Sequence, residues 1–186
     1  MMAHYTLKFV GAQANRRGPD PLSAVALAAS GSGLCCGADM REILFLCTGN
    51  YYRSRYAEAL FNHEASRRGL GWRAFSRGLA IHLAPPDGLS PHTTLRLRER
   101  GISRDRTSKR PSQVADDDFR RANRVIAIKE TEHRPLMADL HPDWENRIEY
   151  WEISDLDGAT PEVALAAIEE KVGKVIDELA GAEQAR

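Results

Sequence analysis

From Met40 onward, apolar and polar positions follow two periods in turn, and the pattern predicts alternating strands and helices. Continuous apolar runs, typical of strands buried on both faces, occur at 42–47 (EILFLC) and 123–128 (NRVIAI), with weaker strand signals at 72–76 and 147–153. Helical spacing predicts helices over 54–69, 90–101, 130–140 and from Thr160 onward, the third interrupted or begun near Pro135. We therefore expect an α/β fold with a mainly parallel four-stranded sheet.

Residues 1–39 differ from the rest, being rich in Ala, Gly and Ser without a sustained period. We expect them to be a disordered tail, a misannotated extension upstream of Met40 or a regulatory arm. The 186 residues suffice for one domain, which we place at 40–181 and interpret as catalytic, with 182–186 as a tail.

Composition excludes some partners. The 26 basic and 26 acidic residues balance, so no global field favours nucleic acid or an anionic membrane, and we interpret the basic run from Arg96 to Arg110 as a solvated surface. No apolar stretch is long enough for a membrane span, and the signal-peptide character of SAVALAAS (23–30) is weak. Three cysteines, of which Cys35 and Cys36 are adjacent, form no disulfide framework, so we expect a cytoplasmic protein; the oligomeric state is left open.

The candidate chemistry lies at 43–55 (ILFLCTGNYYRSR), where a strand signal leads through a Gly-Asn pair into a helix signal. Backbone N–H groups of such a turn, together with the positive end of the helix, bind phosphate-like dianions. The same field favours the thiolate form of Cys47 and makes it a nucleophile. Arg53, six positions later, can hold two phosphate oxygens through its planar fork.

The other loop residues suit this role. Gly49 permits close approach of the backbone, and Asn50 tolerates the left-handed conformation of a tight anion loop. Ser54 can cap the helix and donate a hydrogen bond to the thiolate. We therefore predict a phosphate-binding loop that carries a cysteine nucleophile.

The stretch FLCTGNYYRSRYAE resembles the signature of the low-molecular-weight protein tyrosine phosphatases, a family that also includes thioredoxin-coupled arsenate reductases and protein arginine phosphatases. FSRGL, LRERGIS and ANRVIAI are similar to further segments of that family, so the resemblance runs over residues 41–180. It implies a three-layer sandwich with helices on both faces of a four-stranded parallel sheet, a phosphocysteine intermediate, and no metal or other cofactor. The substrate-binding residues that it implies, beside Cys47 and Arg53, are Thr48, Gly49, Asn50, Tyr51, Tyr52 and Ser54.

The chain departs from the family pattern at several positions. Tyr52 stands where many members carry a second, protective cysteine, and Arg55 replaces the usual proline. Tyr51, bulky and apolar at a position associated with substrate choice, resembles tyrosine phosphatases more than arginine phosphatases. Arg77 and Lys129 replace a small and an acidic residue, so we expect a more basic rim around the site.

A general acid is needed to protonate the leaving oxygen of a phosphate monoester. The family places an Asp-Pro pair after the last strand, and Asp155 matches its aspartate, with Leu156 in place of proline. Asp157 is the rival, and either residue could simply be a turn residue before Gly158. We expect Asp155 to be the acid.

These features predict a metal-independent hydrolase of phosphomonoesters, with a phosphorylated protein, most simply on tyrosine, or a small aryl phosphate as substrate. One alternative is a module of the same fold that binds phosphate and turns over poorly, suggested by Arg55 and Leu156. Another is an arsenate reductase-like enzyme, which needs resolving cysteines, and no cysteine follows Cys47. His63 and Glu64 begin a zinc motif, but Arg67 replaces its second histidine, so we expect no metal site.

Overall fold

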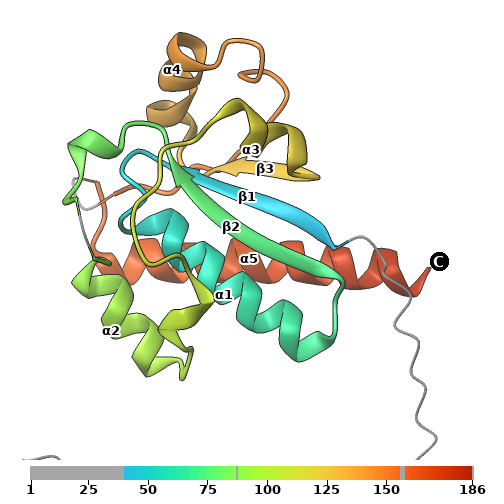
Figure 1. The fold of residues 1–186 in the computed structure, drawn as a ribbon. Helices are drawn as coiled ribbons and strands as arrows, with labels where there is room; N and C mark the ends of the chain where they lie inside the picture. The colour runs from blue at the N-terminus through green and yellow to red at the C-terminus, as the bar shows by residue number, and fades with distance from the viewer. Residues whose placement is uncertain (1–39, 87, 156–157, 186) are drawn as a thin grey trace, which may run out of the picture. The chain divides into compact units, whose positions relative to one another are not determined.

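The computed structural model describes residues 40–86, 88–155 and 158–185. Its four strands form one parallel sheet in the order β2-β1-β3-β4: β1 (Arg41–Cys47), β2 (Trp72–Gly78), β3 (Arg124–Ala127) and β4 (Glu149–Tyr150). The helices are α1 (Arg53–Arg68), α2 (Pro91–Glu99), α3 (Asp116–Arg121), α4 (Glu130–Leu140) and α5 (Pro161–Gln184), with short 3-10 turns η1 (Ile81–Leu83) and η2 (Arg104–Arg106). Strands and helices alternate as predicted (Figure 1).

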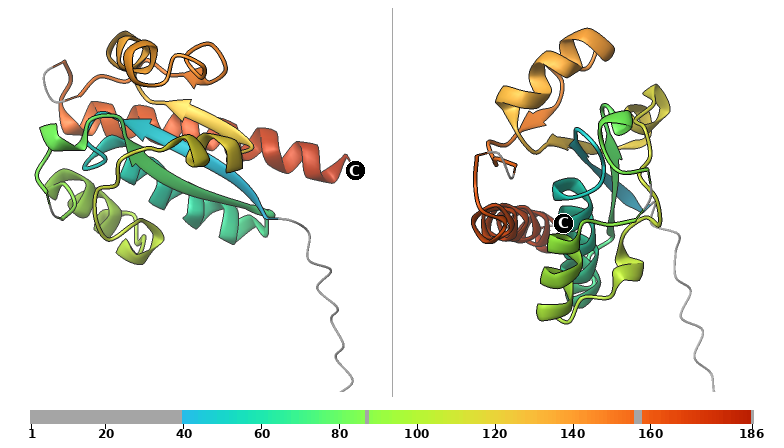
Figure 2. Two further views of the ribbon diagram at one scale, coloured as in Figure 1. Left: turned by 45° about the horizontal axis from the view of Figure 1, so that its top comes forward. Right: turned by 90° about the vertical axis from the view of Figure 1, so that its left-hand side faces the viewer.

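The sheet is the middle of three layers, because β1 is apolar on both faces. Ile43 and Phe45 pack into one core with α1 and α5, whereas Leu44 and Leu46 pack into a second core with α3 and α4. All four of these side chains are fully buried, and each contributes about 1.5 to 3 kcal/mol by leaving water. Figure 2 shows α1 and α5 on one face and α3 and α4 on the other. The predicted α/β sandwich with helices on both faces of a four-stranded parallel sheet is confirmed.

The ends of two helices follow the sequence signals. Gly69 ends α1 in the left-handed conformation, and its N–H bonds the carbonyl of Ser66. Thr160 caps α5 by accepting from the N–H of Val163, and Pro161 occupies the first turn. The helix continues to Gln184, three residues beyond the domain end that we expected at 181.

Other elements differ from the expectations. The strand expected over 147–153 is reduced to β4, Glu149–Tyr150, followed by an isolated bridge between Lys129 and Glu152. Pro135 lies inside a continuous α4 and does not begin or interrupt it. The short helix α3 was not predicted, although its first turn is acidic and its last turn basic, as the helix dipole favours.

In the part of the chain that the structure describes, no helix combines the length and the apolar character needed to cross a membrane. The predicted roles of residues 1–39, including Cys35 and Cys36, lie outside the described residues.

Candidate active site

Cys47 is the last residue of β1, and the loop that follows it is fixed to the segment after β2. The N–H of Leu79 bonds the carbonyl of Cys47 at 2.9 Å, and the N–H of Ala80 bonds the carbonyl of Thr48 at 2.8 Å. Gly78 makes this approach possible, because a Cβ there would lie 2.9 Å from the oxygen of Thr48. The carboxyl ends of parallel strands are where α/β sheets bind ligands, so the loop lies at the expected edge.

The sulfur of Cys47 has an ordered hydrogen-bonding environment. Its Sγ lies 2.9 Å from Oγ of Ser54, and Oγ of Ser54 lies 3.1 Å from the amide nitrogen of Asn50. Since the NH2 of the Asn50 side chain can only donate, the hydroxyl hydrogen of Ser54 is free to point at the sulfur. The hydroxyl of Ser54 can therefore donate a hydrogen bond to the sulfur of Cys47.

Asn50 is fully buried in the left-handed conformation, with φ 49°, as predicted from its type. Its Oδ1 accepts from the N–H of Ser112 at 2.9 Å, and its Nδ2 also donates to Ser76 at 2.8 Å. Ser76 in turn donates to the buried carboxyl of Glu58 at 2.7 Å. The conformation of the loop is thus fixed from β2, α1 and the segment that carries Ser112.

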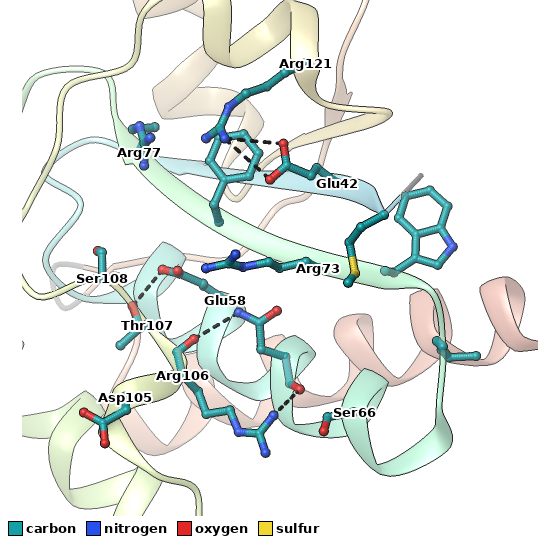
Figure 3. Close-up of a pocket in the computed structure, with 15 residues that line it drawn as sticks. Glu42, Glu58, Ser66, Arg73, Arg77, Asp105, Arg106, Thr107, Ser108 and Arg121 are labelled. Carbon is teal, nitrogen blue, oxygen red and sulfur yellow. Dashed lines mark hydrogen bonds and ion pairs between the residues drawn. The ribbon is translucent and has the colours of Figure 1, made fainter. Parts of the chain in front are cut away.

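Glu58 connects this network to a second cavity of about 650 Å³, beside α1 and β2. There it accepts a second hydrogen bond, from Thr107 at 2.7 Å, which Figure 3 shows beside Arg73 and Ser108. Burial raises the pKa of Glu58, although the two hydroxyl donors oppose this. No cysteine is among the described residues that line this larger cavity, and it therefore lacks the nucleophile that the chemistry requires.

Arg53, in the first turn of α1, is 1% exposed and turns back toward the strand ends. Its Nη1 donates to the carbonyl of Ile153 at 3.2 Å. Its Nη2 lies 2.6 Å from Oδ2 of Asp155 and 2.9 Å from Oε2 of Glu132. Its Nε is buried and has no acceptor among the described residues. Among the guanidinium nitrogens of Arg53, Nε is therefore the one that no described residue uses.

Glu132, in the first turn of α4, was not predicted as part of the site. Both its oxygens lie within 3.0 Å of Nη2 of Arg53, and Oε1 also accepts a hydrogen bond from the hydroxyl of Thr48. Burial alone would raise the pKa of Glu132, but His133, Arg53 and Thr48 outweigh it and hold that pKa well below its usual value. The residue is thus an anion at neutral pH, in contact with the loop that follows Cys47.

His133, fully buried behind Glu132, has a defined protonation state. Its Nδ1 accepts from the N–H of Lys129 at 3.0 Å, so the hydrogen of the neutral ring is on Nε2. Nε2 lies 3.5 Å from Oε1 of Glu132 and has no hydrogen-bond partner among the described residues. Burial lowers the pKa of His133 and keeps the ring neutral, although Glu132 opposes this.

Asp155 reaches the same cavity from the segment after β4. It lines the cavity together with Cys47. Asp157 and Leu156 lie outside the described residues. Tyr52 lies nearby, where burial and then the charge of Asp155 raise its pKa to about 12, so that the phenol stays protonated.

The cavity at Cys47 has a volume of about 280 Å³. Predicted residues that line it are Cys47, Thr48, Gly49, Tyr51, Tyr52, Arg53 and Asp155. Residues that the sequence did not indicate complete its wall: Leu83, Ala84, Pro85, Ser90 and Glu132. Gly49 is required here for a new reason, because a Cβ at this position would lie 2.4 Å from Cβ of Ala84.

Two expectations about this site are corrected. Ser54 does not cap α1: Tyr52 holds the cap position without a side-chain hydrogen bond, and Ser54, like Asn50, is buried behind the loop and does not line the cavity. Nor is the rim basic, because neither Lys129 nor Arg77 lines the cavity, and Arg77 pairs with an aspartate of α3. Among the described residues, the charged side chains that line it are Arg53, Glu132 and Asp155.

Arg55, the residue in place of the usual proline, is a buried structural link. Its guanidinium donates to the hydroxyl of Thr107 at 3.3 Å, to the carbonyl of Gly88 at 2.6 Å and to the carbonyl of Ser108. It therefore joins α1 to the loop before α2 and to the loop after η2.

No group of three or more potential ligands among the described His, Cys, Asp and Glu residues could hold a metal ion. Cys47 is a free thiol. The arrangement suits attack by a thiolate on an anionic centre held by a guanidinium and backbone amides.

Two curated relatives are similar to this chain. A protein-arginine-phosphatase of Bacillus subtilis (strain 168) is 32% identical over 108 residues, covering 58% of this chain and 67% of that protein. An arsenate reductase of Brevibacillus brevis is 30% identical over 118 residues, covering 62% of this chain and 76% of that protein. Two different activities therefore occur among similar proteins.

Among solved structures, a low molecular weight protein tyrosine phosphatase from T. tengcongensis is similar at a TM-score of 0.61, with 26% identity, over 76% of this chain and 99% of that one. The sequence pattern of the low molecular weight phosphotyrosine protein phosphatases matches residues 42–184, which include the cysteine loop and all of the sheet except Arg41, the first residue of β1. The chain therefore belongs to the low molecular weight phosphotyrosine protein phosphatase family.

Proposed function

We propose that this protein is a phosphomonoester hydrolase that works through a phosphocysteine intermediate on Cys47. The observation that carries the proposal is the buried Arg53, whose Nε has no hydrogen-bond partner among the described residues and which lines one cavity together with Cys47 and Asp155. Nucleophile, oxyanion clamp and proton donor then act on one phosphorus atom.

The proposed reaction has two steps. The Cys47 thiolate attacks phosphorus, the bond from phosphorus to the ester oxygen breaks, and Asp155 gives its proton to that oxygen. Arg53 and the loop amides hold the nonbridging oxygens. Asp155 then takes a proton from water as it attacks the phosphocysteine, which releases inorganic phosphate and the thiolate.

The cavity favours an aryl phosphate, and most simply phosphotyrosine. Tyr51, Tyr52, Leu83, Ala84 and Pro85 all line it. Such walls suit a flat aromatic leaving group.

The test is hydrolysis of p-nitrophenyl phosphate without added metal. We expect Cys47→Ser to be inactive and Asp155→Asn to be slowed about a hundred-fold or more, the usual contribution of a general acid. Asp157→Asn is the matched control, since it removes the same charge two residues away and should keep its rate. Equal rates for the wild type and Cys47→Ser would contradict the proposal and favour a phosphate-binding module.

Phosphoarginine is a second candidate substrate. Two carboxylates, Glu132 and Asp155, line the cavity and could bind a guanidinium, and the Bacillus subtilis relative is named a protein-arginine-phosphatase. The ratio of kcat/KM for a phosphotyrosine and a phosphoarginine peptide decides between the two. Arsenate reduction is less well supported, because no cysteine follows Cys47 in the sequence.

A further inference from the structure

Glu132 occupies the hydrogen-bonding edge of Arg53 that a phosphoryl group requires. A guanidinium binds two oxyanion oxygens in parallel through two neighbouring N–H groups. Nη1 of Arg53 donates to the carbonyl of Ile153, which leaves the edge formed by Nε and Nη2. On that edge Nε has no acceptor among the described residues, but Nη2 contacts both Glu132 and Asp155.

The two hydrogens of Nη2 are therefore committed to carboxylates. Glu132 lies at 2.9 Å and 3.0 Å from Nη2 through its two oxygens, and Asp155 at 2.6 Å. Bidentate binding of a phosphoryl group by Arg53 must displace one of them. Asp155 is needed near the leaving oxygen in the proposed reaction, whereas Glu132 has no step in it.

The surroundings of Glu132 provide an alternative partner. Nε2 of His133, which carries the ring hydrogen, lies 3.5 Å from Oε1 of Glu132 and is buried without a hydrogen-bond partner among the described residues. A small rotation of the carboxylate away from Arg53 would bring Oε1 within hydrogen-bonding distance of Nε2. The same rotation frees the hydroxyl of Thr48, which now donates to Glu132, to face the cavity.

We propose that Glu132 is an internal competitor of the substrate: its carboxylate holds the Nη2 side of Arg53, a phosphoryl dianion must displace it toward His133, and Glu132 thereby sets the affinity of the site for phosphate. This inference rests on the proposed function only in taking phosphoryl groups as the ligand. Glu132 is a specificity-determining residue in this scheme and takes part in no bond-making step.

The opposite role makes the opposite prediction. If Glu132 served to orient Arg53 for binding, its neutral variant would bind phosphate more weakly. If it competes, Glu132→Gln binds more tightly, by about ten-fold, because a hydrogen bond to a charged partner is replaced by one to a neutral partner. The sign of the change thus separates the two roles.

The experiment is calorimetric titration of the full chain with inorganic phosphate at constant ionic strength. Glu130→Gln is the matched control, since it removes the same charge from the same turn of α4, where the exposed Glu130 pairs with the half-buried Arg134 at 3.0 Å. Tighter binding by Glu132→Gln with Glu130→Gln within two-fold of the wild type supports the inference. Equal or weaker binding by Glu132→Gln overturns it, as does a failure of every protein to bind phosphate.

Steady-state hydrolysis of p-nitrophenyl phosphate separates this inference from the proposed function. Competition by Glu132 predicts a lower KM for Glu132→Gln without a rise in kcat. If Glu132→Gln binds phosphate more tightly but neither protein hydrolyses the ester, the competitor role holds and the hydrolase proposal fails. If the wild type hydrolyses the ester and Glu132→Gln shows the same KM and phosphate affinity as the wild type, the hydrolase proposal holds and the competitor role fails.

Discussion

Asn50 offers the sharpest test of how the cysteine loop is held. It is fully buried, its side chain makes three hydrogen bonds at 2.8 to 3.1 Å, and its φ is 49°. Two substitutions separate the contribution of the side-chain hydrogen bonds from that of the backbone conformation. Asn50→Gly loses only the hydrogen bonds, because glycine adopts the left-handed conformation freely. Asn50→Ala loses the same hydrogen bonds and also forces a residue with a Cβ into that conformation.

The magnitudes follow from the contacts. Each buried hydrogen bond contributes about 1 kcal/mol net, so Asn50→Gly should lower the free energy of unfolding by about 3 kcal/mol. A left-handed alanine costs about 1 kcal/mol more than glycine, so Asn50→Ala should lose about 4 kcal/mol. Both variants should hydrolyse p-nitrophenyl phosphate slowly, because the hydroxyl of Ser54 loses the donor that directs it to Cys47.

The assay is urea unfolding followed by far-ultraviolet circular dichroism. Asn146→Ala is the control, because Asn146 is exposed and accepts only a surface hydrogen bond from Arg134; it should change the free energy of unfolding by less than about 0.5 kcal/mol. A loss below about 1 kcal/mol in Asn50→Ala would refute the network argument. Equal losses in the alanine and glycine variants would refute the backbone argument.

Three further predictions concern the neighbouring structure. Arg55→Met should lower the free energy of unfolding by about 3 kcal/mol, because two carbonyls and a hydroxyl lose a charged donor; a loss under about 1 kcal/mol would contradict this. Burial raises the pKa of Glu58 above its usual 4.5, so the wild type should lose stability relative to Glu58→Gln as the pH rises through that raised pKa; parallel pH profiles in urea unfolding would contradict this. Gly78→Ala should slow hydrolysis of p-nitrophenyl phosphate about ten-fold or more, because the new Cβ would lie 2.9 Å from the carbonyl oxygen of Thr48. Gly173→Ala, whose Cβ meets nothing within 4 Å, should leave the rate unchanged, and equal rates in both variants would disprove the steric reasoning.

The fold could be predicted because its central strands carry strong local signals. β1 and β3 are buried on both faces and read as continuous apolar runs, and Gly69 and the Thr160–Pro161 pair mark helix ends by their backbone preferences. α3 escaped prediction because six residues with one buried aromatic, Phe119, do not complete an amphipathic period. The length of β4 was overestimated because the apolar residues after it are buried without belonging to a strand. Trp151 and Ile153 pack in the core beyond its end.

The cysteine loop could also be predicted from the sequence, because its residues are contiguous. Cys47, Arg53 and the turn between them lie within seven residues, and a strand-to-helix turn brings such neighbours together whatever the rest of the chain does. The sequence also indicated Asp155, but only through the family resemblance. Its contact with Arg53 at 2.6 Å depends on the path of the chain after β4.

Glu132 could not be found by this reasoning, because its position depends on how distant segments pair. It is 79 residues from Arg53 in the sequence, and the two meet only because β3 lies parallel to β1 and both strands end at the same edge of the sheet. A weaker signal did exist: Glu132 lies in the first turn after a predicted strand, where acidic residues are common simply because they favour the positive end of a helix. Stabilisation of the helix start alone would explain an acidic residue at this position, so the sequence gives no reason to expect a contact with Arg53. In the structure the same carboxylate does both. The phosphate titration of Glu132→Gln and Glu130→Gln separates the two effects, because both residues are in the first turn of α4 and only Glu132 contacts Arg53.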